Sequence, residues 1–336
     1  MHFMKQALAR AADFVVLLGR RVGGAVRRHP WRAAAVVPLL LLLPLLYVLA
    51  LVPFTPGIGD LRKAKTQQPA VVLTADGKEL AVFRRVNREW VELSAISPHV
   101  VKALVATEDH RFYEHHGIDV RRTLAAAAST LAGGREGGST ITQQLARNLY
   151  PEEIGRAPTI TRKVKEAITA LKIESVYQKD EILESYLNTV PFLYNAHGIE
   201  MAARTYFDKS AGELDVLEGA TLVGMLKGTS YYNPVLNPER SLQRRNIVLG
   251  QMARHRQLAP EQVEALKQRP LKLDFERQGD DPGPAPHLAQ QLRRWLIDWA
   301  DRHGYDMYAD GLVVHTTIDS RLQQLALEAV ERQGDK

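Results

Sequence analysis

The feature that most constrains this chain is an uncharged, apolar run near its N-terminus. No charged side chain occurs from Ala33 to Gly59, and residues 33–54 (AAAVVPLLLLLPLLYVLALVPF) are almost wholly apolar. At about 1.5 Å per residue, a helix over these residues is roughly 33 Å long, enough to cross the hydrocarbon core of a bilayer. Pro38 and Pro44 are costly in a soluble helix but tolerated in a membrane helix. The sequence therefore predicts a single transmembrane helix at residues 33–54.

The residues before this run form a basic tail. Residues 1–32 hold seven of the 44 Lys and Arg residues and one of the 38 Asp and Glu residues, so the rest of the chain carries no net charge. The overall charge of +6 thus comes from the tail and not from a basic binding surface, which argues against a nucleic-acid partner. By the positive-inside rule the tail is cytoplasmic, and everything after residue 55 lies outside the plasma membrane. A cleaved signal peptide is the alternative, but the apolar core is long for one and no small-residue cleavage site is evident near Pro53.

The absence of cysteine removes several kinds of chemistry. The 336 residues include none, which excludes a disulfide scaffold, a zinc-thiolate or iron–sulfur protein and a thiol enzyme. With 45% hydrophobic and 24% charged residues, the composition is that of a folded protein.

Beyond the apolar run, the sequence predicts mainly helices with a small β-containing connector at each end. Residues 55–95 read as a linker with a β-hairpin at 70–83, because two β-rich runs flank Asp76-Gly77. Residues 96–270 form the main domain, whose helices begin after Ser97-Pro98 and then lie near 120–132, 140–149, 160–177, 179–188, 198–206, 213–227, 238–255 and 260–267. Residues 271–336 hold a linker at 282–287, a helix at 288–303, a strand at 311–318 and a final helix from about Ser320.

The segment ATEDHRFYEHHG (residues 106–117) is the densest cluster of reactive side chains. Glu108 and Asp109 end an apolar helix, and a carboxylate beside apolar neighbours is suited to act as a general base. The alternative is that the pair only ends one helix and caps the next. The three histidines of the segment (His110, His115 and His116) lack the spacing of a zinc protease, so we expect no metal site there.

The segment GREGGSTITQQLARNLY (134–150) predicts a glycine-rich loop that leads into a helix carrying Gln143, Gln144 and Arg147. Backbone amides of such a loop, at a helix N-terminus, are suited to binding phosphate. It is not a Walker loop, because no Gly-Lys-Ser/Thr follows. Taken alone, a glycine-rich loop is more often a loop that binds nothing.

The segment RKVKEAITALKIESVY (162–177) predicts a helix with two distinct faces. One face is an apolar stripe, and Glu166 lies nearly opposite it among small, aliphatic and aromatic residues instead of further charges. Glu166 is therefore expected to face a cleft, with Arg162 and Lys163 one turn back to neutralise an anion. The alternative is an ordinary exposed ion pair between Lys163 and Glu166.

Two further segments are less informative. KDEILESYLNTVPF (179–192) reads as structural, with Ile182, Leu183, Tyr186 and Leu187 in the core. Lys227, next to Gly228, is a candidate anion contact, although a lone lysine is usually solvated.

The order of these segments is more specific than any one of them. The runs EDHRFYEHHG, GGSTITQQL, RKVKE and ILESYLN, followed by LVGMLKG and YNP, resemble the five motifs of the peptidoglycan glycosyltransferases, glycosyltransferase family 51. This membrane-anchored family includes the class A, bifunctional penicillin-binding proteins. The resemblance covers residues 70 to 260.

The resemblance implies a role for each matching residue. Glu108 resembles the catalytic base that removes the proton from the acceptor sugar 4-hydroxyl. Glu166 resembles the second essential carboxylate, which assists departure of the lipid pyrophosphate directly or through a cation. Substrate-binding residues implied in the same way are Asp109, Ser139, Thr140, Gln143, Gln144, Arg147, Arg162, Lys163 and Lys227. Arg147 stands where relatives often have lysine, which keeps the charge but changes the geometry of a phosphate contact.

The family's properties complete these expectations. The implied fold is mainly α and lysozyme-like, and the implied reaction polymerises lipid II into β-1,4-linked glycan strands with inversion and release of undecaprenyl pyrophosphate. No cofactor is required by the sequence, while Mg or Mn at Glu166 and the pyrophosphate is an option, and moenomycin is the implied inhibitor. The implied location is the bacterial inner membrane, with the catalytic domain on the periplasmic side and cell-wall synthesis proteins as partners. The Ala-rich stretch 118–132 is the candidate for the membrane-dipping part.

Class A penicillin-binding proteins continue into a transpeptidase domain, and residues 311–334 resemble the connector that enters it. The sequence has no Ser-x-x-Lys, Ser-x-Asn or Lys-Thr-Gly, so it carries no transpeptidase site. We expect a piece of a bifunctional enzyme; the alternative is a variant that retains only glycosyl transfer. Two rival functions stay open: a lysozyme-like glycan-cleaving enzyme, since two carboxylates also suit that reaction, and a non-catalytic membrane scaffold for cell-wall synthesis.

Overall fold

The computed structural model describes residues 42–59, 61, 69–83, 88–131, 137–277, 285–308 and 310–334. The chain divides into two compact units, one ending at Thr55 and the other beginning at Pro56. In the first unit, residues 42–51 are helical and lead into a 3₁₀ turn, η1 (Val52–Phe54). Within the described ranges, no helix is both long and apolar enough to cross a membrane. The basic tail and residues 33–41 of the expected transmembrane helix lie outside the described residues.

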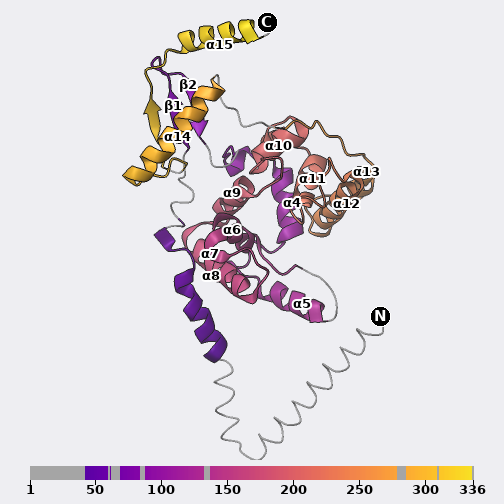
Figure 1. Ribbon diagram of the computed structural model, residues 1–336. Coiled ribbons are helices and arrows are strands. Elements are labelled where there is room, and N and C mark those ends of the chain that lie inside the picture. Colours follow the sequence, from indigo (N-terminus) through magenta and orange to yellow (C-terminus); the bar gives the residue numbers. More distant parts are fainter. Residues whose placement is uncertain are drawn as a thin grey trace, which may run out of the picture. The chain divides into compact units, whose positions relative to one another are not determined.

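The second unit is mainly helical, as the sequence predicts (Figure 1). Its main domain contains η2 (Leu93–Ala95), α4 (Pro98–Glu108), α5 (Val120–Leu131), α6 (Ile141–Leu149), α7 (Pro151–Ile154), α8 (Ile160–Val176), α9 (Lys179–Thr189), α10 (Ile199–Phe207), η3 (Ala211–Glu213), α11 (Val216–Met225), α12 (Pro238–Arg254) and α13 (Pro260–Lys267). The predicted helices of this domain are confirmed. The short α7 was not predicted, because four residues carry no readable periodicity.

Side-chain caps set where several of these helices begin. Ser97 accepts a hydrogen bond from the amide of His99 at the start of α4, and Asp215 accepts two amides at the start of α11. Thr140 caps α6 in a reciprocal pair with Gln143. Each such cap is worth about 1 kcal/mol, so the chain marks these boundaries locally, before any tertiary packing.

The core of the main domain is one cluster of buried side chains to which almost every helix contributes. Helices α4 and α11 pack on α12, and α6 packs on α8 and α9. Arg245 is fully buried beside this core and donates to backbone carbonyls at and just after the end of α13, those of Leu266, Lys267, Arg269 and Pro270. A buried guanidinium is compatible with such a core because its donors are paired.

The two β-containing connectors form a single sheet. Strands β1 (Ala70–Leu73) and β2 (Glu79–Phe83) are an antiparallel hairpin, which confirms the prediction at residues 70–83. Strand β3 (Val313–His315) pairs in parallel with β1, so the strand order is β2-β1-β3. Helix α14 (Pro286–His303) packs on this sheet, and α15 (Ser320–Gly334) follows β3. Residues 278–284, which include the first half of the predicted linker at 282–287, lie outside the described part.

Gly117 brings the loop between α4 and α5 into contact with α8. Its φ is +80°, and a Cβ atom at this position would lie 2.9 Å from the backbone C and O of Ala170. Its carbonyl also accepts a hydrogen bond from Thr140 Oγ1 at 2.6 Å. One residue therefore ties together the loop after Glu108 and the two helices that carry most of the candidate site residues.

We predict that Gly117→Ala destabilises the fold. A positive φ costs an L-residue about 1 to 2 kcal/mol, and overpacking against backbone atoms adds about 1 to 3 kcal/mol. Chemical denaturation should therefore show a loss of about 2 to 4 kcal/mol in the free energy of unfolding. Gly304→Ala is the control for backbone strain alone, because Gly304 is left-handed (φ +76°, ψ +24°) with no atom within 4 Å of the added Cβ. Equal losses in the two variants would contradict the importance of the contact with α8.

Candidate active site

Glu166 lies in the middle of α8 and is fully buried. Its Oε2 lies 2.5 Å from Lys163 Nζ, and its Oε1 lies 3.5 Å from Arg162 Nε and 3.9 Å from Arg147 NH1. The expectation that this face of the helix is not solvated is confirmed. The alternative of an ordinary exposed pair is wrong for Glu166, although the ion pair with Lys163 is present.

The charges around Glu166 do not cancel. Three cations surround one carboxylate, and the side chains of Lys163 and Arg147 are 43% and 36% exposed. The Oε1 atom has no hydrogen bond, although it is buried. Lys163 Nζ also donates to Ser139 Oγ at 2.8 Å, which joins the end of the glycine-rich loop to the cluster. An excess of accessible positive charge beside a loop at a helix N-terminus is suited to an anionic group such as a phosphate.

The donor set around Glu166 does not fit a metal ion held by the protein. Mg²⁺ and Mn²⁺ prefer several oxygen ligands, whereas the nearest side chains here are cationic. No group of three or more His, Asp or Glu residues suited to a metal occurs in the described part of the chain. We therefore assign the positive charge at this site to the protein's own cations.

The histidines of the first motif have partners of other kinds. His110 stacks on His255 with ring centroids 4.3 Å apart, and His115 Nε2 lies 2.9 Å from Asp109 Oδ2. Burial, with His110 and Arg254 nearby, lowers the pKa of His255. The lowered pKa of His255 disfavours a charge on its ring, so the stacked pair is consistent with a packing role.

Glu108 is the last residue of α4, and its side chain is 16% exposed. Gln144 Nε2 donates to its Oε2 at 3.0 Å, and Arg244 NH2 lies 3.8 Å from its Oε1. The hydroxyl of Tyr186 donates to Gln144 Oε1 at 3.0 Å. The sequence suggested apolar neighbours for this carboxylate; the structure instead places an amide and a guanidinium beside it. Sequence reasoning missed Arg244 and read Tyr186 only as core, because their helices, α12 and α9, meet α4 and α6 only in the folded chain.

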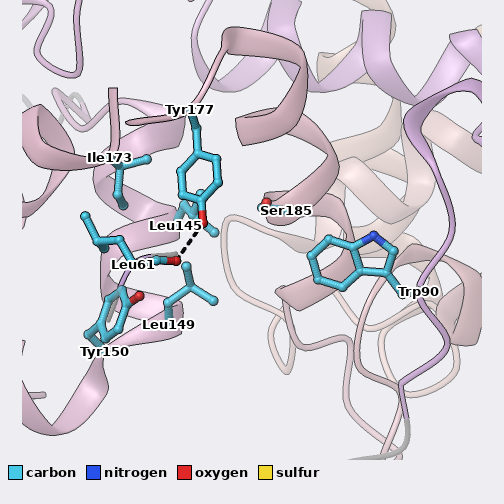
Figure 2. A pocket seen from close by; sticks show the side chains of 8 residues that line it. All are labelled: Leu61, Trp90, Leu145, Leu149, Tyr150, Ile173, Tyr177 and Ser185. Carbon is cyan, nitrogen blue, oxygen red and sulfur yellow. Dashed lines mark hydrogen bonds between the residues drawn. The ribbon is translucent and has the colours of Figure 1, made fainter. Parts of the chain in front are cut away.

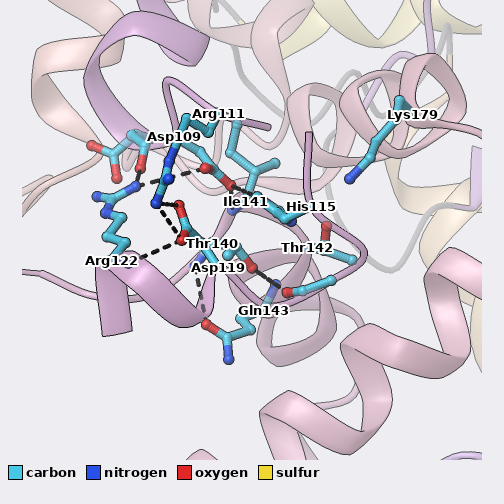
Figure 3. A network of polar contacts seen from close by, with 12 residues as sticks. Asp109, Arg111, His115, Asp119, Arg122, Thr140, Ile141, Thr142, Gln143 and Lys179 are labelled. Carbon is cyan, nitrogen blue, oxygen red and sulfur yellow. Dashed lines mark hydrogen bonds and ion pairs between the residues drawn. The ribbon is translucent and has the colours of Figure 1, made fainter. Parts of the chain in front are cut away.

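Asp109 is fully buried in the polar network shown in Figure 3. Besides His115, its Oδ2 accepts the backbone amide of Ile141 at 3.1 Å, and Arg122 NH1 lies 3.8 Å from its Oδ1. These contacts join the residue after Glu108 to the first residue of α6. The position fits a residue that orients the site from within the protein better than one that touches a substrate.

The side chains of Thr140 and Gln143 form the N-terminal cap of α6. The backbone N–H of Gln143 donates to Thr140 Oγ1 at 3.2 Å, and the backbone N–H of Thr140 donates to Gln143 Oε1 at 3.0 Å. Both side chains are buried. Of the predicted binding residues, Ser139, Arg147, Arg162 and Lys163 gather at Glu166, and Gln144 lies at Glu108. Lys227 is exposed and makes no polar contact with the described residues.

Helix α5 is linked to the backbone of Glu108 by Arg122. This side chain donates to the carbonyl oxygen of Glu108 and, at 3.1 Å, to that of Gly137. The same helix exposes apolar side chains, with Val120 62% and Leu124 65% exposed. The predicted helix is confirmed, and its expected contact with the membrane stays a prediction.

An apolar hollow on the other side of α6 contains none of the candidate residues (Figure 2). It is lined by Leu61, Trp90, Leu145, Leu149, Tyr150, Ile173, Tyr177 and Ser185. The Tyr177 hydroxyl donates to the carbonyl of Leu61 at 2.6 Å, which fixes the segment before the sheet on α8. The hollow lacks a charged side chain, so it does not supply the chemistry of the site.

Comparison with known proteins gives a consistent result. Residues 76–253 match the sequence model of the family described as transglycosylase. Penicillin-binding protein 1A of Escherichia coli (strain K12) is 37% identical over 282 residues, which cover 83% of this chain and 32% of that protein. Penicillin-binding protein 1A of Aquifex aeolicus (strain VF5) is 35% identical over 286 residues, covering 84% and 38%. The chain thus spans about a third of the length of the curated relatives it matches.

Among solved structures, the crystal structure of penicillin-binding protein 1A from Haemophilus influenzae matches with 25% identity and a TM-score of 0.40. That match covers 78% of this chain and 29% of the other. The resemblance read from the five motifs is confirmed by the family match and by the curated relatives.

We predict that Asp119→Asn weakens the fold in a pH-dependent way. Asp119 accepts two hydrogen bonds from Arg111, at 2.5 and 2.7 Å, and caps α5 through the amide of Arg122. Burial acts to raise its pKa, but these hydrogen bonds outweigh burial and hold the pKa of Asp119 below its ordinary value of 3.8. The stabilisation is therefore complete well above pH 3.8 and is lost as the pH falls through the lowered pKa.

Denaturation near neutral pH should show a loss of about 2 kcal/mol for the variant, from the cap and the broken pair together. The difference from wild type should shrink as the pH falls below the ordinary aspartate value. A difference that stays constant with pH would contradict this assignment.

Proposed function

Because the chain belongs to the transglycosylase family, we propose that it is a peptidoglycan glycosyltransferase that polymerises lipid II into β-1,4-linked glycan strands. One observation carries the proposal: α6 presents partners to both carboxylates. Gln144 contacts Glu108 and Arg147 lies beside Glu166, and these two residues are three positions apart on one helix face. The carboxylates of Glu108 and Glu166 therefore lie beside the same face of α6, about one helical turn apart.

Glu108 is proposed as the general base. It ends a helix, remains partly accessible, and has Gln144 hydrogen-bonded to one oxygen and Arg244 3.8 Å from the other. In this role it takes the proton from the 4-hydroxyl of the acceptor sugar while that oxygen attacks the anomeric carbon of the donor. Attack on the face opposite the leaving group inverts an α-linked donor to a β-linked product.

The cluster at Glu166 is proposed to bind the departing pyrophosphate. Arg147, Arg162 and Lys163 provide positive charge where negative charge develops, and the buried Glu166 holds these cations in place. Ser139 and the adjacent loop amides add neutral donors.

This arrangement favours synthesis over glycan cleavage. In a glycoside hydrolase the second carboxylate must reach a sugar or a water molecule, whereas Glu166 is fully buried among cations. A cationic cluster instead suits a substrate whose leaving group is an anion. Lipid II has such a leaving group, undecaprenyl pyrophosphate.

We also propose that the protein is anchored in the bacterial inner membrane with its catalytic domain on the periplasmic side. The proposal rests on the apolar run at residues 33–54 and the basic tail before it. The exposed Val120 and Leu124 of α5 are consistent with a second, interfacial contact near the lipid substrate. Other cell-wall synthesis proteins are proposed partners on the periplasmic side.

We predict that Glu108→Gln abolishes polymerisation. The substitution keeps the shape of the side chain but removes the base, so glycan formation from labelled lipid II should fall by about 10² to 10⁴-fold. Gel analysis of the products of the detergent-solubilised protein measures this, and moenomycin should abolish the wild-type products.

Glu152→Gln serves as the control, because Glu152 is 83% exposed and pairs with Arg156 on the surface. Wild-type protein that is folded yet makes no chains, with or without divalent cations, would contradict the proposed activity. A scaffold would keep its cellular role in the Glu108→Gln variant, whereas a polymerase would lose it.

We predict that Arg147 acts through its charge. Arg147→Lys should retain most of the activity, since lysine also reaches Glu166 and a phosphate, while Arg147→Met should lower kcat/KM for lipid II by about 10-fold or more. Initial rates at several lipid II concentrations measure both variants. Equal activity of the methionine variant and wild type would remove Arg147 from the proposed pyrophosphate site.

A further inference from the structure

We propose that Tyr186 is a positioning residue for Glu108: its hydroxyl holds the side-chain amide of Gln144 so that the NH₂ group faces the carboxylate. The kinetic consequence of this inference rests on the proposed function, in which Glu108 is the base. From the sequence alone, the segment that contains Tyr186 was expected to be structural.

The geometry forms a chain of two hydrogen bonds. The Tyr186 hydroxyl donates to Gln144 Oε1 at 3.0 Å, and Gln144 Nε2 donates to Glu108 Oε2 at 3.0 Å. Tyr186 is 1% exposed and belongs to the main core cluster, so its ring cannot move aside without opening that core. The amide of Gln144 thus has a rigid support on the side away from Glu108.

Tyr186 keeps its proton under all ordinary conditions. Burial raises the pKa of its hydroxyl, and the charge of Glu108 raises it further, while Arg147 opposes this. The protonated hydroxyl is thus available as the donor to Gln144 Oε1 that the structure shows. If the amide turned over, its oxygen would face the Glu108 carboxylate, and two acceptors would oppose each other.

The other groups that face Glu108 do not replace this support. From α12, Arg244 NH2 lies 3.8 Å from Oε1, which is beyond hydrogen-bond distance. From α5, Arg122 donates to the main-chain carbonyl of Glu108 and not to its carboxylate. From α6, Arg147 is directed to Glu166. Gln144 therefore provides the single side-chain hydrogen bond to this carboxylate within the described residues, and Tyr186 sets its direction.

The test is the variant Tyr186→Phe, which keeps the buried ring and removes only the hydroxyl. Without it, the amide loses its fixed direction and the ionised carboxylate loses part of its stabilisation. The titration midpoint of the Glu108 carboxyl should therefore move to higher pH. In protein labelled with ¹³C at the glutamate carboxyl, NMR titration reads this midpoint, and Glu108→Gln identifies the resonance.

Tyr206→Phe is the matched control. Tyr206 is also fully buried, and its hydroxyl also makes one hydrogen bond, to the carbonyl of Phe192 at 2.6 Å. It lies on α10, and its ring contacts Tyr194 and Phe275, which are not among the candidate site residues. Both variants lose a buried tyrosine hydrogen bond, so both should lose stability, and only Tyr186→Phe should move the midpoint.

The pH profile of polymerisation gives the second readout. In Tyr186→Phe, kcat should fall about 3- to 10-fold with little change in KM, and the acidic limb of kcat/KM should move to higher pH in step with the NMR midpoint. Tyr206→Phe should keep the wild-type limb.

The outcomes separate the two proposals. Equal midpoints in wild type and Tyr186→Phe would overturn the role of Tyr186, whatever the activity. If Tyr186→Phe shifts the Glu108 midpoint but the wild-type protein makes no glycan chains, the positioning of Glu108 is supported and the proposed reaction is contradicted.

Discussion

The hydrogen bonds at the N-terminus of α6 are the constraint on which the site depends. Thr140 caps the helix, Asp109 accepts the amide of its first residue, and Gly117 accepts the Thr140 hydroxyl. Thr140, Asp109 and Gly117 are all buried, so water does not compete for these hydrogen bonds. They fix both the position and the rotation of α6, and with it the positions of Gln144 and Arg147.

Electrostatics then distinguish the two carboxylates. Glu166 is enclosed by three cations and is inaccessible, while Glu108 is partly accessible and has one hydrogen-bonded amide and one more distant guanidinium. A buried carboxylate inside a cationic cluster is a costly arrangement for stability, because each charge is taken out of water. Such an arrangement is understandable where the cations must be held ready for an anionic group, as the proposed leaving group requires.

Much of this could be predicted from local sequence. The cap at Ser97, the helical periodicity from residue 96 to 270 and the hairpin around Asp76-Gly77 depend on near neighbours, and all are found. The unsolvated face around Glu166 was predictable as well, because the residues that share it are uncharged. The sequence predicted a cleft there, whereas the side chain is fully buried. The surroundings of Glu108 were not predictable, since Gln144 and Arg244 come from two other helices and no local pattern reports their approach.

The sequence by itself determined the order of the elements, the family motifs and the residues able to carry charge and donate protons, because these follow from residue types and short-range spacing. Only the tertiary structure decided which of those residues meet. It placed Asp109, Thr140 and Gln143 in the framework instead of at an open surface, and it gave Tyr186 and Arg244 a place beside Glu108. It also joined β1 and β3 from opposite ends of the second unit. The physical reason is that helix and strand preferences act over a few residues, whereas the packing of helices and the burial of polar groups depend on the whole chain at once.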